Sequence, residues 1–421
     1  MFLRRISLTI SIIVFCSTIL FGGSKKSLNE LIDRAIYVSP QLKMLQAKFE
    51  AAKNKIPQNS NLPDPQLKLG LVSLPVNSFS LTQEPMTGKM ISLTQGIPFP
   101  GKLGANEDVN TIDPEIILQM IMEEQNRITK EVKIAYYDYL FYTKALQFIL
   151  DKKELFGSIR EVVQTKYEVS KASQQNILSV DLAITNISDK IEKLKAEKEI
   201  ALTKLQVYLL SSESISLNET DLTKPGDETF TYKKVESFAV DSRPLLNQIQ
   251  LLKEKSKFAE EAAEYEFLPD FNLTLQYNQR DEIAASNTDL VDFFSVIVGF
   301  NLPINYGGKK SAKVEEAKSF QEYYDYQYQS ALQSIQIESE TLIAKLNSLR
   351  EREQLIDETK MIQAGETFNA ALSNYQVGEI DFINVIQAVN DLLEIETDLY
   401  RVRKNYFQEK AKLAFIAGTE F

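Results

Sequence analysis

The side chains that most often do chemistry in proteins are nearly absent from this sequence. Its 421 residues include no His and one Cys, Cys16. Without imidazole the chain cannot build a Ser-His-Asp or Cys-His nucleophile, a His-ligated metal site or a His proton switch. With no Cys after residue 16, thiolate metal sites and disulfides are excluded from the rest of the sequence. The Asp and Glu residues are scattered without a paired motif. We therefore expect no enzymatic activity, no cofactor and no metal site.

Two local patterns resemble ligand sites and fail on inspection. The segment 307–311 (Gly-Gly-Lys-Lys-Ser) is similar to a phosphate-binding loop, but the upstream glycine of that motif would be at position 303, where the chain has Pro303. Met86 and Met90 offer two thioethers near a loop, which is too little for a copper site. A net charge of −11, from 47 Lys and Arg against 58 Asp and Glu, leaves no basic surface for nucleic acid.

The first residues have the composition of a targeting signal. Arg4 and Arg5 precede an apolar run over 6–21, which ends at the small residues 22–24. This pattern predicts a secretory signal peptide over 1–24. Lipidation of Cys16 stays open as an alternative, although Phe15 is bulky where a lipobox usually has a small residue. No second apolar run of ~20 residues follows, so the mature chain could enter a membrane only as β-strands.

The remaining sequence repeats itself once. Four markers recur in the same order at separations of 204 to 208 residues. They are Ser39-Pro40 with Arg243-Pro244, Leu62-Pro63-Asp64 with Leu268-Pro269-Asp270, Ile97-Pro98 and Gly101-Lys102 with Leu302-Pro303 and Gly308-Lys309, and Tyr167-Glu168-Val169-Ser170 with Tyr375-Gln376-Val377-Gly378. A repeat of this kind predicts two equivalent structural units. Each unit should contain short helices, a strand pair and a long helical hairpin.

Apolar and polar residues alternate in four segments, 66–71, 90–94, 271–278 and 294–302. The apolar positions are Leu67, Leu69, Leu71, Ile91, Leu93, Phe271, Leu273, Leu275, Tyr277, Phe294, Val296, Val298 and Phe300. This period predicts strands with one apolar face, which fits a water-soluble sheet or a transmembrane barrel. Strands of about 9–11 residues suit a tilted membrane crossing, and the chain is expected to be exported.

Long helical segments follow each strand pair, at 113–170 and 310–372. At 1.5 Å per residue they would reach about 87 and 95 Å, more than a globular domain needs. The segments that return from them have apolar residues spaced by 3 and 4, as in Ile177, Val180, Ile184 and Ile187. That spacing predicts antiparallel, coiled-coil-like packing.

Four strands cannot close a barrel, and an open edge in lipid leaves backbone groups unpaired at several kcal/mol each. If the strands enter a membrane, several copies must therefore combine them. Two copies would give about eight strands and a barrel filled by side chains, whereas three would give about twelve and begin to leave a lumen. A conduit favours three copies.

The sequence resembles the TolC family of outer-membrane efflux channels over essentially the whole mature chain. The resemblance rests on Ser39-Pro40, on 62–65 (Leu-Pro-Asp-Pro), on 91–102 (Ile-Ser-Leu-Thr-Gln-Gly-Ile-Pro-Phe-Pro-Gly-Lys), and on Tyr375 with Gly378. The segment 91–102 is the most specific and is closest to the branch that serves heavy-metal exporters. The resemblance implies a mainly α fold with a small β part, assembled as a homotrimer with a twelve-stranded β-barrel on an α-helical barrel.

The resemblance also implies the division of the chain. The boundaries are a signal peptide at 1–24, N-terminal helices and an equatorial part at 25–62, a barrel strand pair at 63–102, a long hairpin at 103–210, an equatorial segment at 211–240, a helix of the second repeat at 241–268, a second strand pair at 269–308, and a second long hairpin with the C-terminal segment at 309–421. The thirteen apolar strand positions should then face lipid.

The turns between the long helices, near 170–175 and 377–381, should form the periplasmic tips. By resemblance they hold the aperture and dock the adaptor. The gating tyrosine corresponds to Tyr375 and the tip glycine to Gly378, but the aspartates that constrict the pore correspond to Asn384 and Gln387. Asp381 is a nearby acid that could form a ring selecting cations, although solvated tip charge is the simpler interpretation. In the first repeat Tyr167, Ser170, Ser173 and Asn176 occupy the equivalent docking positions.

We therefore expect the outer-membrane exit duct of a tripartite efflux system, extending into the periplasm, passive and gated at its helix tips. The partners implied are a periplasmic adaptor (a membrane fusion protein), an inner-membrane pump of the RND type and outer-membrane lipid, with no nucleic acid. The alternative is a soluble periplasmic coiled-coil scaffold or adhesin without channel activity.

Overall fold

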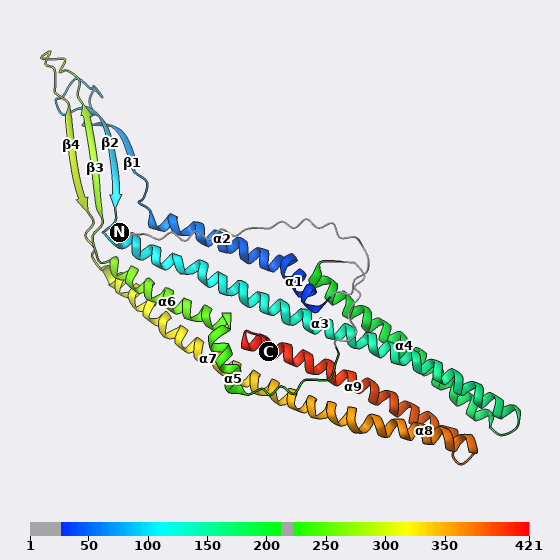
Figure 1. The fold of residues 1–421 in the computed structure, drawn as a ribbon. Coiled ribbons are helices and arrows are strands. Elements are labelled where there is room, and N and C mark those ends of the chain that lie inside the picture. The colour runs from blue at the N-terminus through cyan, green and yellow to red at the C-terminus, as the bar shows by residue number, and fades with distance from the viewer. Residues whose placement is uncertain (1–26, 212–221, 421) are drawn as a thin grey trace.

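The computed structural model describes residues 27–211 and 222–420, so the predicted signal peptide, Cys16 and part of the 211–240 segment lie outside the described residues. The chain is long and narrow, with a β-sheet at one end and two helical turns at the other (Figure 1). Most of the length between them is helix, which confirms the mainly α prediction.

The sheet consists of β1 (Gln66–Val72), β2 (Gly88–Ile97), β3 (Phe271–Gln279) and β4 (Phe293–Phe300). All neighbours are antiparallel, in the order β1-β2-β3-β4. The two strands of each repeat form a hairpin, and β2 pairs with β3 to join the repeats. Among the described residues, no strand pairs with the outer edge of β1 or of β4.

The first repeat begins with α1 (Leu28–Val38), which has a capping box between Ser27 and Glu30, and α2 (Pro40–Ser60), which has its proline at the first helical turn. After the strand pair, α3 (Lys102–Glu168) and α4 (Gln174–Leu209) form the long hairpin. The predicted start of α3 at 113 is wrong, because the helix continues through Pro114 and begins after Gly101. A single proline removes one hydrogen bond, and the packing of a 67-residue helix compensates for it.

The second repeat follows the same plan, with α5 (Tyr232–Ser242) and α6 (Pro244–Tyr265) before its strands. A 3₁₀ turn (Tyr306–Gly308) leads into α7 (Lys309–Leu355), and α8 (Met361–Val377) and α9 (Phe382–Ala417) complete the hairpin. The long helical stretch expected over 310–372 is present, but it is not one uniform α-helix. A π-helical turn at Ile356–Lys360 separates α7 from α8, and the helical stretch continues to Val377.

The helices form one layer. Near the sheet its order is α2, α3, α6, α7, and toward the turns it is α4, α3, α9 and then α7 with α8. Buried apolar residues fill three clusters along this layer, of which α3 contributes buried residues to two and α9 to two. Among residues 27–211 and 222–420, no helix has both the length and the apolar composition to cross a membrane.

Candidate gate and candidate membrane face

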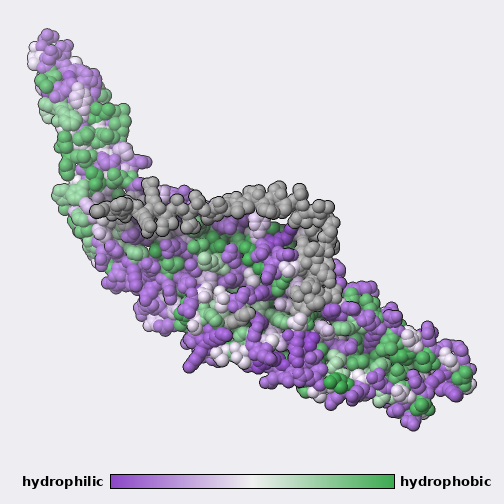
Figure 2. All heavy atoms as spheres, in the orientation of Figure 1, coloured by the Kyte–Doolittle hydropathy of each residue, from purple (hydrophilic) through white to green (hydrophobic). Residues whose placement is uncertain are grey.

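The strand register places all thirteen apolar strand positions on one face of the sheet. Directly opposed residues share a face, and the register pairs Leu69 with Ile91, Ile91 with Tyr277, and Tyr277 with Phe294. Eleven of these side chains are exposed, such as Leu69 at 73% and Val298 at 66%, whereas Phe271 and Leu273 are half-buried. Figure 2 shows the hydrophobic surface over the sheet below its hydrophilic outer end.

The opposite face of the sheet carries mainly small and polar side chains. Ser92, Gln276 and Ser295 lie in one cross-strand row, and the Thr94 and Thr274 hydroxyls are 2.8 Å apart in the next. The apolar exceptions on this face are Val72 of β1, Met90 of β2, and Phe293 and Ile297 of β4. One exposed apolar face and one polar face match the wall of a transmembrane barrel, whose lumen is polar.

Asp270, the acid of the second Leu-Pro-Asp marker, ties the sheet to the first long helix. Its carboxylate accepts hydrogen bonds from Lys102 Nζ at 2.9 Å and from the backbone N–H of Phe99 at 3.0 Å. Burial acts to raise the pKa of Asp270, but these two hydrogen bonds outweigh it and lower the pKa. The contact joins the two repeats at the start of α3, where Gly101 adopts φ 96 and a side chain would collide with Tyr265.

The two helical tips are built alike, and they lie side by side at the end opposite the sheet (Figure 1). At the first tip the backbone N–H of Lys171 donates to Lys166 O at 2.7 Å, and at the second Glu379 N–H donates to Asn374 O at 2.9 Å. Both bonds close the same six-residue turn around a residue in the left-handed conformation. The predicted tip turns therefore lie where the repeat places them.

Tyr375, the predicted gating tyrosine, is buried at 6% exposure and packs on Phe382 with ring centroids 5.1 Å apart. Burial raises the pKa of its hydroxyl. Lys166 of α3 lies over the same ring, with Nζ 4.3 Å from the centroid. Lys166 Nζ also donates to Tyr375 O at 2.8 Å and to Gln376 O at 3.1 Å, so it neutralises the carbonyl end of α8.

Lys166 therefore connects the two hairpins, and the sequence analysis missed it. Its position in the last turn of α3 is typical of a residue that caps its own helix, whereas the structure directs it to another helix 209 positions away. Only the packing of the hairpins reveals this contact.

The other predicted tip residues gather at the same end but are mostly solvent-exposed. Asp381 precedes α9, and Asn384 Nδ2 donates to its backbone carbonyl at 3.3 Å. Gln387 Nε2 donates to Asp391 at 2.7 Å. At the first tip Ser173 Oγ is 3.1 Å from Asn176 Oδ1, while Tyr167 and Ser170 are exposed. None of these contacts gives the exposed side chains a role on its own.

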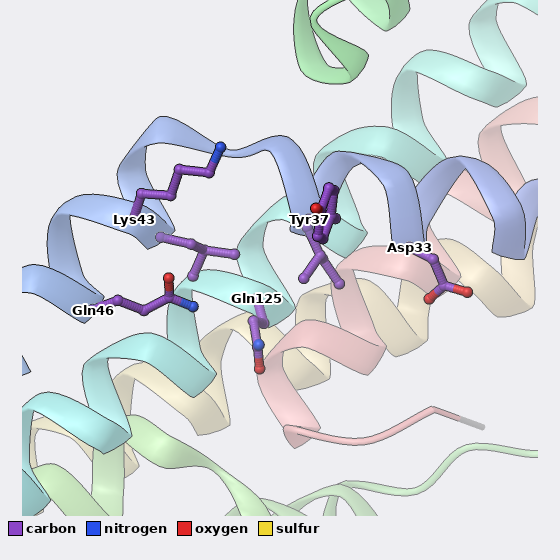
Figure 3. Close-up of a pocket in the computed structure, with 7 residues that line it drawn as sticks. Asp33, Tyr37, Lys43, Gln46 and Gln125 are labelled. Carbon is purple, nitrogen blue, oxygen red and sulfur yellow. The ribbon is translucent and has the colours of Figure 1, made fainter. Parts of the chain in front are cut away.

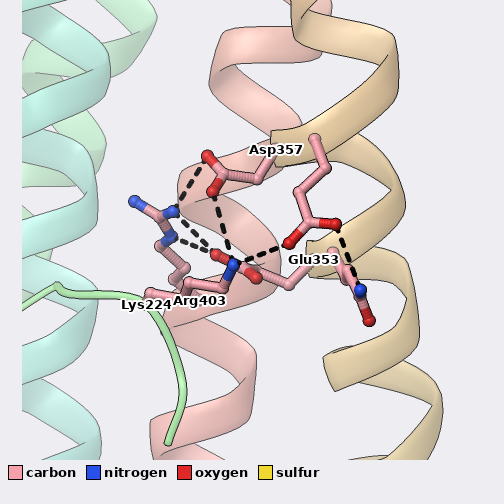
Figure 4. A network of polar contacts seen from close by, with 6 residues as sticks. Lys224, Glu353, Asp357 and Arg403 are labelled. Carbon is pink, nitrogen blue, oxygen red and sulfur yellow. Dashed lines mark hydrogen bonds and ion pairs between the residues drawn. The ribbon is translucent and has the colours of Figure 1, made fainter.

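A buried charge network surrounds the π-helical turn (Figure 4). Glu353 is 1% exposed and accepts a hydrogen bond from Arg403 Nε of α9 at 2.8 Å. The same guanidinium reaches Asp357 at 3.2 Å. Lys224, from the segment before α5, donates to Glu358 at 3.0 Å. The network holds the irregular turn between α7 and α8 against its neighbours, where a π turn leaves the helix ladder weakened.

A cavity of about 390 Å³ lies at the junction of α1, α2 and α3 (Figure 3). Its lining includes Asp33 and Tyr37 from α1, Lys43 and Gln46 from α2, and Gln125 from α3. Tyr37 is 82% exposed, and the polar side chains do not converge on one point. We assign no ligand to this cavity.

The family model of outer membrane efflux proteins matches residues 238–419. No curated protein sequence matches the chain. Among solved structures, CusC has a TM-score of 0.77 and 15% identity, covering 96% of this chain and 96% of its own. VceC from Vibrio cholerae has a TM-score of 0.73 and 16% identity, covering 94% and 96%.

The MtrE outer membrane channel of Neisseria gonorrhoeae, solved in its open state, has a TM-score of 0.73 and 14% identity, covering 93% of this chain and 89% of MtrE. Identities this low establish a shared fold. The family model matches the second repeat, from within α5 to the C-terminal end of α9. Residues 238–419 therefore match the family of outer membrane efflux proteins, and the described chain has the fold of CusC, of VceC and of the MtrE outer membrane channel.

Proposed function

We propose that three copies of this chain complete one passive channel, with the sheet in the outer membrane and the helices in the periplasm. Channels of this family are homotrimers that work with adaptor proteins and inner-membrane pumps. The observation that carries the proposal is an exposed apolar face that continues across all four strands of a sheet whose two edges are open. Such a sheet is stable in lipid only when its edges are paired.

The thirteen apolar strand residues would form the contact with outer-membrane lipid. β2 has ten residues and a length of about 33 Å, which allows a tilted crossing of the hydrocarbon core. The divisions expected from the sequence fit this placement, with residues 63–102 and 269–308 in the barrel and the hairpins in the periplasm.

The aperture would lie at the second tip, where Tyr375, Gly378, Asp381, Asn384 and Gln387 follow one another through the turn into α9. Lys166 supports this assignment because it holds α8 against the first hairpin. Opening would separate the hairpins and break these contacts. A ring of three Asp381 carboxylates at the narrow end would favour cations electrostatically.

The first tip would dock the adaptor through Tyr167, Ser170, Ser173 and Asn176, because these side chains are accessible or partly accessible at the periplasmic end. The energy for export would come from an inner-membrane pump, for which we propose the RND type.

Reconstitution tests this function directly. The purified chain should have the native mass of a homotrimer and should conduct ions after insertion into a planar bilayer. Conductance should be low at rest and should rise when the tip contacts are removed. A monomer that stays soluble without detergent and conducts no ions would support the periplasmic scaffold instead.

A further inference from the structure

The inference concerns the contact between neighbouring copies, and it rests on the proposed trimer. At the sheet end of the described chain, the two repeats are joined through β2 with β3 and α3 with α6. In a closed ring every second repeat must also meet the first repeat of the next copy. That junction would use β4 with β1, and α7 with α2, which are the counterparts of the elements joined within the chain.

The repeats are regular enough to transfer this junction residue by residue. The hairpin β1–β2 pairs Leu67 with Leu93, and β3–β4 pairs Leu273 with Val298. Leu67 and Leu273 differ by 206 positions, and Leu93 and Val298 by 205. Every pair of one hairpin maps onto a pair of the other with these two offsets.

The pair that joins the repeats at mid-sheet is Leu93 of β2 with Leu275 of β3. The same offsets take Leu93 to Val298 and Leu275 to Leu69. Val298 and Leu69 both lie on the exposed apolar face, and a register shifted by one residue would place one of them on the polar face. The transferred register therefore continues the apolar face across the boundary between copies.

The ion pair between Lys102 and Asp270 at the base of the sheet, here called the polar clamp, also has equivalent residues at the boundary between copies. Lys102 has Lys309 as its counterpart, and Asp270 has Asp64. Lys102 and Asp270 form an ion pair at 2.9 Å, with their side chains 20% and 32% exposed. Within the described part of the chain neither the Asp64 side chain nor the Lys309 side chain has a hydrogen bond or an ion pair, and both residues are exposed. Both lie at the open edges, Asp64 just before β1 and Lys309 at the start of α7.

We propose that Asp64 of one copy binds Lys309 of the next, beside an antiparallel pairing of β1 with β4 in which Leu69 lies opposite Val298. This contact is the intermolecular counterpart of Asp270 with Lys102. It leaves no unpaired strand edge in the ring, and it gives the interface a charged pair that fixes which residues meet.

Disulfide trapping tests the register. Directly opposed residues in an antiparallel pair have Cβ atoms about 4.5–5.5 Å apart, whereas diagonal neighbours are about 7–8 Å apart. The variant Leu69→Cys with Val298→Cys should give covalent dimers and trimers on a non-reducing gel after mild oxidation. Leu69→Cys with Val296→Cys, and Leu69→Cys with Phe300→Cys, are matched controls shifted by two residues and should give far less. The equivalent pair Leu93→Cys with Leu275→Cys should close within one chain and give no intermolecular product.

Charge exchange tests the clamp. Asp64→Lys and Lys309→Asp should each lower the temperature at which the trimer separates, and the double variant should restore it. The native mass of every variant is measured as well, to show whether it is still a trimer. A trimer in which a shifted pair cross-links best, or in which the charge exchange restores nothing, overturns this contact and leaves the trimer standing. A wild-type chain that is monomeric overturns the proposed function as well.

Discussion

Ser170 and Gly378, which lie 208 positions apart, occupy the same left-handed position after the ends of α3 and α8. Their φ angles are 62° and 85°. Each lies inside the same backbone turn, closed by Lys171 N–H on Lys166 O and by Glu379 N–H on Asn374 O. The two tips therefore share one geometry with different residues, and only the second tip has the residue type that adopts this conformation without strain.

This difference predicts opposite effects of substitution at the two tips. Ser170→Gly should stabilise the first turn by about 1 kcal/mol, because a residue with a Cβ is strained in the left-handed region. Gly378→Ala should destabilise the second by about 1–2 kcal/mol for the same reason. Hydrogen exchange at the Lys171 and Glu379 amides reports both changes. Gly365→Ala is the control, since Gly365 lies within helix α8 with open space around it and should gain stability.

Lys166→Met should loosen the contact between the hairpins. The variant keeps the aliphatic stem but loses the donors to Tyr375 O and Gln376 O and the charge over the Tyr375 ring. We expect higher conductance of the reconstituted trimer at low voltage. Lys171→Met, an exposed lysine on the same tip, should leave conductance unchanged.

Tyr375→Phe removes the hydroxyl and keeps the ring, so it distinguishes the contributions of the two groups to the closed state. The hydroxyl oxygen is buried without a hydrogen-bond partner in the described part of the chain, so the variant should keep the closed state. If Lys166→Met conducts like the wild type, Lys166 does not hold the gate.

The apolar face of the sheet should not tolerate charge. Val296→Lys should reduce insertion and trimer yield, because a lysine facing the middle of the bilayer costs about 2–4 kcal/mol in transmembrane barrels. Ser295→Lys, the adjacent position on the opposite face, should be tolerated. The yield of heat-resistant trimer in outer-membrane fractions measures both. Equal losses for the two variants would contradict the assigned lipid face.

Arg403 should be needed for the stability of the second hairpin. Arg403→Met leaves Glu353 buried and unpaired, which costs about 3–5 kcal/mol for a buried ion pair. Adding Glu353→Leu should recover most of that loss in denaturant unfolding. Lys224→Met removes the exposed member of the same network, at 52% exposure, and should destabilise the hairpin far less than Arg403→Met because solvent screens its ion pair. A double variant as unstable as Arg403→Met would show that the pair does more than satisfy Glu353.

Lys152 should make the free energy of unfolding depend on pH in the alkaline range. It lies at a cavity of about 300 Å³ between α3, α4 and α9, and its Nζ donates to Asn390 Oδ1 at 3.0 Å. Its pKa is lowered from 10.5 to about 8, mainly by burial and secondarily by the charge of Lys190, while Glu396 and Asp391 of α9 oppose the shift.

The direction in which the free energy of unfolding changes with pH follows from proton binding. Below about pH 8 the lysine is charged in both states, and the folded state carries the full cost of its burial. Between about 8 and 10.5 the unfolded state binds more protons, so the free energy of unfolding rises with pH. Lys152→Met should lack this rise, and Lys193→Met, at an exposed lysine of α4, should keep it. If the free energy of unfolding changes with pH in the same way for Lys152→Met and the wild type, Lys152 is not a buried ammonium.

Much of the fold could be predicted because the signals are local. Period-two alternation predicted the four strands and their apolar positions, and Pro40 and Pro244 marked helix starts that the structure has. The repeat predicted two equivalent tips, and the matching turn bonds at Lys171 and Glu379 agree with it. Where local signals conflicted, the prediction failed. The helical segment was expected from 113, but continuous packing carries α3 through Pro114 from Lys102, and no residue pattern indicated the π turn at 356–360.

By itself the sequence determined which residues are apolar, how they alternate and that the pattern occurs twice, because these properties belong to neighbouring residues. Tertiary structure alone decided the β2–β3 register, the burial of Glu353 against Arg403 and the reach of Lys166 to the end of α8. Those contacts join residues that are 50 to 209 positions apart. Their partners are set by how whole helices and strands pack, a choice that no short stretch of sequence encodes.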